Sequence, residues 1–102
     1  MKTKIKTIDV HAKEWFDRIY GNSYFSMNIT INYGLESAQT FFVPMQYGYG
    51  NHYEDMAFKA LQTKGFIPNQ PPNASYSNYY YSNKIIYRAS KQANCPKREL
   101  KY

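Results

Sequence analysis

The chain has 102 residues and a net charge of +6, and 19% of its residues are aromatic, with twelve tyrosines against one tryptophan. This length suits one small domain and excludes two hydrophobic cores. The single Cys95 excludes an internal disulfide, and two histidines do not complete a spaced zinc set. No segment has the apolar length of a signal peptide or a membrane span. We therefore expect a cytoplasmic protein without a metal or cofactor.

The first twenty residues predict a short strand followed by a helix. Apolar residues alternate loosely over residues 3–10, and Asp9 is placed to cap a helix that ends at Gly21. Apolar side chains then repeat at helical spacing at Ala12, Trp15, Phe16 and Ile19.

Residues 23–33 carry the clearest strand pattern in the chain. Polar residues separate an apolar series made of Phe25, Met27, Ile29, Ile31 and Tyr33, as in a sheet with one dry and one wet face. The short connection 34–37 contains a glycine and predicts a hairpin to a second strand at 39–46. Pro44 cannot donate to a ladder, so it indicates an edge strand or a bulge.

A second helix is predicted directly after the tyrosine-glycine turn at 47–50. Asn51 suits the N-cap, and Glu54 three residues later completes a capping box. One apolar stripe follows, formed by Tyr53, Met56, Ala57, Ala60 and Leu61. Lys64 and Gly65 have the chemistry of a helix C-terminus.

Residues 69–83 are rich in asparagine, serine, proline and tyrosine, which predicts a long loop lying over the domain or over a partner. Residues 84–90 alternate as a last strand. The predicted organisation is one domain at 1–91, with a basic tail or short terminal helix at 92–102.

The expected order of elements is strand, helix, strand, strand, helix, strand. This α+β order is that of a ferredoxin-like sandwich, βαββαβ, with two helices on one face of an antiparallel sheet. The alternative is a three-stranded meander with a helix on each side.

The positive charge lies mainly at the end of the chain, where residues 84–102 hold six basic side chains and one acidic one. Concentrated positive charge attracts polyanions, so nucleic acid or an acidic protein face is an expected partner. A tail that serves only solubility is the alternative.

Tyrosines and cations share the region from residue 76 onward. Single-stranded nucleic acid is bound by this combination, because cations contact phosphates while rings stack on bases. Protein interfaces are also enriched in tyrosine and arginine. A third interpretation is that the rings cover a core left open by a small sheet. The candidate binding residues are Tyr76, Tyr79, Tyr80, Tyr81, Lys84, Tyr87, Arg88, Lys91, Lys97 and Arg98.

No catalytic role is expected. His11 with Asp9, and His52 with its acidic neighbours, lack a recognisable nucleophile motif, and residues adjacent on a helix do not face one another. The glycines at 48 and 50 would admit a phosphate, but acidic residues 54 and 55 oppose an anion there, which favours a structural turn.

The segments GNSYFSMNITI and FFVPMQYGYGNHYEDMAFKAL resemble small uncharacterised proteins of bacteriophages and mobile elements, over about residues 10–66. The resemblance implies no site. It implies a protein that binds host nucleic-acid machinery, as inhibitors of defence nucleases do. Our first hypothesis is a nucleic-acid-binding protein. The alternative is an accessory or inhibitor protein that binds a host complex, such as a nucleic-acid-processing or CRISPR-type defence effector.

Overall fold

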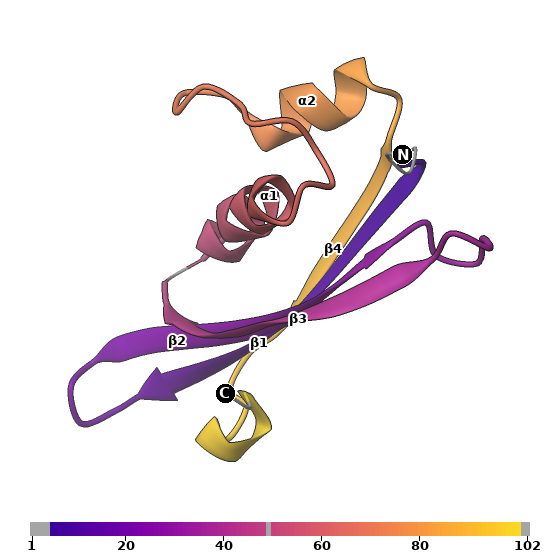
Figure 1. Cartoon of the computed structure of the whole chain (residues 1–102). Helices are drawn as coiled ribbons and strands as arrows, with labels where there is room; N and C mark the ends of the chain where they lie inside the picture. Colours follow the sequence, from indigo (N-terminus) through magenta and orange to yellow (C-terminus); the bar gives the residue numbers. More distant parts are fainter. Residues whose placement is uncertain (1–4, 49, 101–102) are drawn as a thin grey trace.

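The computed structural model describes residues 5–48 and 50–100, and it combines one four-stranded sheet with helices on both sides (Figure 1). Its strands are β1 Thr7–Asp17, β2 Asn22–Ile31, β3 Gln39–Tyr47 and β4 Ile86–Gln92. Its helices are α1 His52–Thr63, α2 Tyr76–Ser82 and the short 3₁₀ helix η1 Lys97–Leu100. The last two residues of the predicted tail, the first four residues of the predicted domain and Tyr49 in the predicted turn lie outside the described residues.

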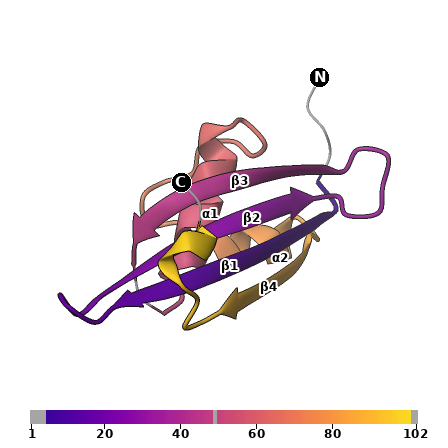
Figure 2. The same cartoon turned by 90° about the horizontal axis from the view of Figure 1, so that it is seen from below.

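The strand order in the sheet is β3-β2-β1-β4 (Figure 2). β1, β2 and β3 form an antiparallel meander, whereas β4 pairs with β1 in parallel. Both α-helices, α1 and α2, lie in the crossover that carries the chain from β3 at one edge to β4 at the other. The α+β class is confirmed. The ferredoxin-like βαββαβ order is wrong, because the three antiparallel strands come first and no helix separates β1 from β2.

The predicted first helix is instead the second half of β1. Ile8, Val10 and Ala12 alternate toward the helical layer and are almost fully buried, with exposed fractions of 0–2%. β1 is a central strand that pairs with β2 on one side and β4 on the other. Residues 7–13 are paired on both edges, and Trp15 and Phe16 continue the pairing with β2. This pairing overrides the helical spacing of the two aromatic residues, since helix propensity is a weak preference that tertiary contacts often override. Asp9 consequently lies within a strand and caps no helix.

The two strands of the predicted hairpin are confirmed, with β2 and β3 paired from Ile31↔Gln39 to Tyr24↔Tyr47. The register shifts between Phe25 and Met27, where Pro44 and Met45 face the single Ser26. Pro44 therefore lies in a bulge on an edge strand, as its missing N–H predicts.

The predicted helix α1 is confirmed, but its predicted capping box is wrong. Asn51 occupies the N-cap with φ −92° and ψ 11°, outside the extended region that caps normally adopt, and its side chain makes no cap hydrogen bond. At the other end Gly65 takes φ +81° and its N–H donates to the Gln62 carbonyl, as predicted. Gly48 is buried, and a Cβ there would lie 2.7 Å from Cε1 of Phe25, so the turn serves packing.

The predicted long loop at 69–83 contains α2, so the loop assignment is wrong for Tyr76–Ser82. Ser75 caps this helix, its Oγ accepting from the Asn78 N–H at 3.4 Å. Composition indicated a loop, but α2 buries Tyr80 against Phe58 of α1, and that packing stabilises a short helix of otherwise weak propensity.

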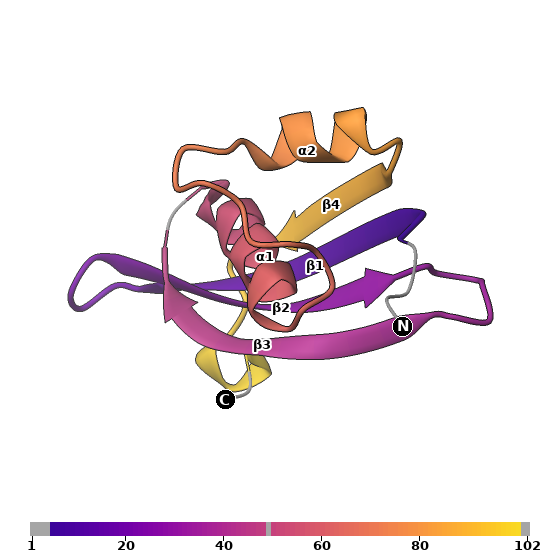
Figure 3. The same ribbon diagram turned by 45° about the horizontal axis from the view of Figure 1, so that its top comes forward.

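The main core lies between the helical layer and one face of the sheet (Figure 3). We call this side of the sheet the helical face and the other the open face. Among the described residues, no helix combines the length and apolarity that crossing a bilayer requires. The main core is formed by Ile5, Ile8, Val10, Ala12, Phe25, Met27, Ile29, Ile31, Val43, Tyr53, Ala57, Phe58, Leu61, Ile67 and Tyr80.

The end of the chain returns to the sheet on the open face, where η1 lies beneath β1 and β2 (Figures 1 and 2). Cys95 is 4% exposed, Leu100 is fully buried, and Ser26 on β2 is only 3% exposed. The backbone N–H of Cys95 donates to the Glu14 carbonyl at 2.9 Å. The segment from Cys95 to Leu100 is thus a packed part of the domain.

Replacing Leu100 with alanine should lower the free energy of unfolding by about 2–5 kcal/mol, because it removes a fully buried side chain and leaves a cavity. Denaturant unfolding of the variant measures this. Arg98→Ala, two residues away and exposed, should change stability by no more than about 0.5 kcal/mol. Equal, small effects of the two substitutions would show that the segment is not anchored by Leu100.

Candidate functional site

The candidate tyrosines divide between the core and the surface. Tyr80 is 2% exposed, and three more rings (Tyr76, Tyr79 and Tyr87) are half-buried beside it on the helical face. Tyr81, by contrast, is 88% exposed. Four of the five candidate rings therefore pack together inside the domain and one projects into solvent.

These four rings and Phe58 of α1 form what we call the tyrosine cluster. Tyr80 stacks on Tyr87 with 4.7 Å between ring centroids and meets Phe58 edge-on at 5.7 Å. The Tyr87 hydroxyl donates to Oε1 of Glu54 at 2.6 Å. The Tyr80 hydroxyl is buried without a hydrogen-bond partner among the described residues. This geometry supports the interpretation that the rings cover a core left open by a small sheet.

Burial within the cluster suppresses tyrosine ionisation. Burial, followed by the neighbouring Tyr76 and Glu54, raises the pKa of Tyr80. Burial and the hydrogen bond to Glu54 raise the pKa of Tyr87. Burial also raises the pKa of Tyr53 and of Tyr76. All four hydroxyls are therefore neutral at physiological pH and serve as packing groups or donors.

The candidate cations do not meet the tyrosines in one surface. Lys84 is exposed in the turn after α2, at φ +56°. Arg88 lies on the open face, where it forms a salt bridge to Asp9 at 2.6 Å. Lys91 returns to the helical face and binds Glu14 at 3.3 Å and the Gly50 carbonyl at 3.0 Å.

Strand alternation explains this separation. Along β4, residues 87, 89 and 91 point toward the helices while 88 and 90 point to the open face, so adjacent residues cannot share a patch. Lys97 and Arg98, the last two candidates, are exposed on η1 beneath the open face. The continuous basic, tyrosine-rich surface expected from the sequence is therefore not formed.

The open face holds a different group of rings, which we call the aromatic row: Trp15 on β1, Tyr24 on β2 and Tyr47 on β3. They occupy paired positions on neighbouring strands. Trp15 stacks on Tyr24 at 5.5 Å between centroids, and Tyr24 meets Tyr47 edge-on at 5.9 Å. Nζ of Lys97 lies 5.3 Å from the Trp15 ring centroid, a cation–π distance. Tyr47 is 52% exposed.

Sequence reasoning missed the aromatic row because it placed Trp15 on a helix. The signal was present in the alternation of His11, Lys13 and Trp15, which share one face of a strand. The pairing of Tyr24 with Tyr47 also follows from the hairpin register once the bulge at Pro44 is counted.

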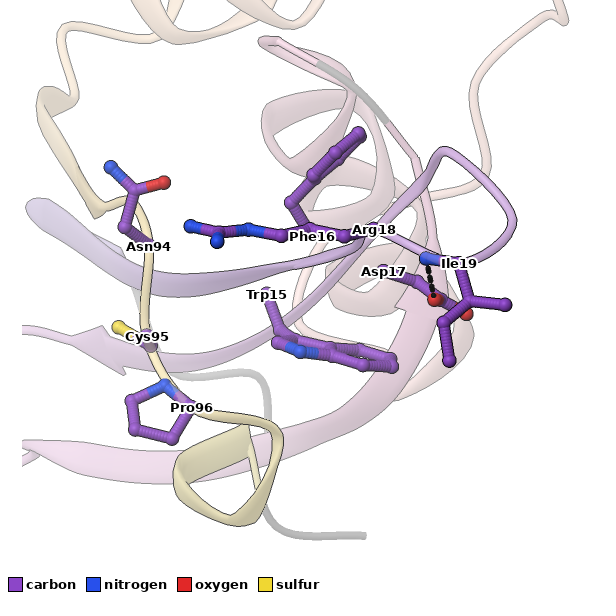
Figure 4. Close-up of a pocket in the computed structure, with 8 residues that line it drawn as sticks. All are labelled: Trp15, Phe16, Asp17, Arg18, Ile19, Asn94, Cys95 and Pro96. Atoms are coloured by element: carbon purple, nitrogen blue, oxygen red, sulfur yellow. Dashed lines mark hydrogen bonds between the residues drawn. The ribbon is translucent and has the colours of Figure 1, made fainter.

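A cavity of about 490 Å³ lies beside the row, between the β1–β2 turn and the segment before η1 (Figure 4). Trp15 lies on the side of η1 and Phe16 on the opposite side of the β1 ribbon, as alternation requires. Arg18 projects across the gap toward Asn94. The cavity is lined by Trp15, Phe16, Asp17, Arg18, Ile19, Asn94, Cys95 and Pro96.

The centre of the open face is polar, with a second, 190 Å³ cavity. Nδ1 of His11 and Oγ of Ser90 lie 2.8 Å apart. Both carboxylate oxygens of Asp9 are engaged by Arg88, at 2.6 and 3.0 Å, so this acid is held by the arginine and not by His11. Among the described residues no group of three or more histidine, cysteine or acidic side chains is arranged to hold a metal ion.

Comparison of the chain with protein-family models, with curated proteins and with solved structures finds no match.

Proposed function

We propose that this protein binds single-stranded nucleic acid on the open face of its sheet, through the aromatic row and the cations of η1. The observation that carries the proposal is the position of Lys97 Nζ, 5.3 Å from the centroid of the Trp15 ring, which is itself stacked on Tyr24. A positive charge therefore lies beside a pair of stacked aromatic rings.

The rings supply stacking surfaces at a suitable spacing. Adjacent strands are about 4.8 Å apart, so rings on three strands form a platform of about 10 Å that accommodates two or three bases. Tyr47 is the most exposed of the three rings. The exposure of Trp15 should increase when Lys97, which is itself exposed, moves away from the ring to contact a phosphate. An unpaired strand can lay its bases on such rings, whereas a duplex keeps its base faces stacked inside.

The cations supply the attraction for phosphates. Lys97 and Arg98 are exposed on η1, and Arg18 is exposed across the neighbouring cavity. With a net charge of +6 the whole chain also attracts polyanions at long range. Phosphate contacts of this kind give affinity without base readout, so we expect little sequence preference.

Fluorescence anisotropy with a labelled oligothymidine and a labelled duplex of equal length tests the proposal at several salt concentrations. The single strand should bind more tightly. Tyr47→Ala should weaken binding about 5- to 150-fold, the effect of losing one stacked base. Lys97→Gln combined with Arg98→Gln should reduce the slope of log affinity against log salt by about 1.4.

Matched controls lie on the other side of the molecule. Tyr81 is even more exposed than Tyr47, and Lys84 is an exposed cation near it on the α2 side of the domain. Tyr81→Ala with Lys84→Gln should leave the affinity unchanged. Absence of binding at low salt, or equal losses in the two sets of variants, would rule out the open face as a nucleic-acid site.

A second function, docking to a protein of a host complex, is favoured by the β1–β2 turn. Ile19 is 85% exposed and Tyr20 77% exposed at its tip, and large apolar side chains gathered in solvent are typical of protein-binding sites. The double variant Ile19→Asp with Tyr20→Asp should no longer bind a purified partner complex. The variant Tyr81→Asp should still bind it. If oligonucleotide binding is lost instead, the turn belongs to the nucleic-acid site.

A further inference from the structure

The outer edge of β3 borders two neighbouring cavities, which we together call the groove. At one end a 350 Å³ cavity is lined by the first part of β3, Lys64 and Phe66. At the other end a 290 Å³ cavity is lined by residues 42–44 and 46 of β3 and by one side of α1. Lys64 borders both cavities, so together they follow the strand from Gln39 to Gln46.

The edge itself is available for pairing. β3 is the last strand of the sheet, and no described strand pairs with its outer side. Residues 39–43 pair regularly with β2 and precede the bulge, so their outward N–H and C=O groups form a regularly spaced row that no described strand pairs with. A free edge beside an apolar groove is the arrangement that extended peptides use when they add a strand to a sheet.

The groove combines an apolar floor with a positive rim. Met56, Ala60 and Val43 contribute apolar side chains, while Lys59 and Lys64 stand at its border. Nζ of Lys64 lies 5.2 Å from the Phe41 ring centroid, which holds this charge over the groove. Among the described residues that line the two cavities none is acidic. The groove therefore complements alternating apolar and negative side chains.

We infer that this groove binds an extended acidic segment of a partner protein, which pairs with residues 39–43 of β3 and places alternate apolar side chains against α1. A second copy of this chain fits less well. Antiparallel pairing of two β3 edges keeps both α1 helices on the same face, so the rims of like charge would face each other. This inference does not depend on the proposed nucleic-acid site, which lies on the opposite face.

The probe for the test is a capped peptide of about eight residues that alternates valine and glutamate, long enough to cover the regular part of the edge. Added to the full chain labelled with ¹⁵N, it should shift amide resonances of residues 39–43, of residues 56–63 in α1 and of Lys64, and it should slow hydrogen exchange along β3. A peptide alternating valine and lysine should bind at least about tenfold more weakly.

Charge reversal at the rim should abolish this preference for the acidic peptide. Lys59→Glu with Lys64→Glu should weaken the acidic peptide about tenfold, while Lys6→Glu, an exposed lysine outside the groove, should not. Three outcomes would overturn the inference: no shifts along β3 at millimolar peptide, equal binding of both peptides, or dimerisation of the free chain through β3. A fourth would be displacement of the peptide by oligothymidine, because the peptide would then lie on the open face.

Discussion

Replacing Tyr80 with alanine should lower the free energy of unfolding by about 3–5 kcal/mol, the range for removing a buried aromatic side chain. Tyr80 is 2% exposed and contacts Phe58, Tyr76, Tyr79 and Tyr87, so no neighbouring ring can fill the space without leaving its own partners. Because the native state of a domain this size is stable by only about 5–15 kcal/mol, the variant should unfold at a much lower denaturant concentration.

Two further variants separate packing from polarity. Tyr80→Phe keeps the ring and removes a buried hydroxyl that has no partner among the described residues, so stability should rise by about 1 kcal/mol. Tyr81→Ala, the neighbouring and 88% exposed ring, should change stability by less than about 0.5 kcal/mol. If Tyr81→Ala were as costly as Tyr80→Ala, the orientation of α2 described above would be incorrect.

Stability should fall steeply above pH 10, with a slope of about 3 kcal/mol per pH unit from Tyr80 and Tyr87 together. Both tyrosines have a pKa raised above the ordinary value of 10.0, mainly by burial. Below pH 10 the hydroxyls are protonated in both states and the contribution to stability is complete. Above it the unfolded chain releases protons that the native chain retains, and deprotonation therefore favours unfolding.

Denaturant unfolding of the wild-type and Tyr80→Phe proteins between about pH 9 and 12 measures this contribution, because lysines titrate in the same range but equally in both proteins. The difference in stability should be constant below pH 10 and then grow by about 1.4 kcal/mol per pH unit in favour of the variant. A difference that does not change with pH would mean that the Tyr80 hydroxyl ionises as easily in the native state as in the unfolded one.

Strands and helices with a single strong pattern were predictable from the sequence. Alternation from Phe25 to Ile31 gave β2, and the stripe from Tyr53 to Leu61 followed by Gly65 gave α1. Both depend on local periodicity, and α1 depends also on the chemistry of a helix end. The predicted Asn51 capping box is wrong because the Asn51 backbone, at φ −92° and ψ 11°, lies outside the extended region that a cap adopts, and the side-chain pattern does not reveal this.

The residues predicted to form one site lie apart in the structure for a related reason. Residues 76–91 contain rings and cations close together in sequence, but the helix α2 and the strand β4 direct them to different sides. Tyr80 contacts Phe58 on the helical face, whereas Arg88 binds Asp9 of the neighbouring strand on the open face. The aromatic row shows the reverse relation between sequence and space. Trp15, Tyr24 and Tyr47 are distant in sequence, and strand pairing makes them neighbours.

The sequence alone determined that this protein is a small α+β domain with a positive charge, an amphipathic central helix and a hairpin, because composition and short periodicities specify these locally. The tertiary structure decided that residues 11–17 extend a central strand, that β4 lies parallel to β1, and which rings are buried. These features depend on hydrogen bonds and contacts between residues up to about 80 positions apart, which no local pattern contains.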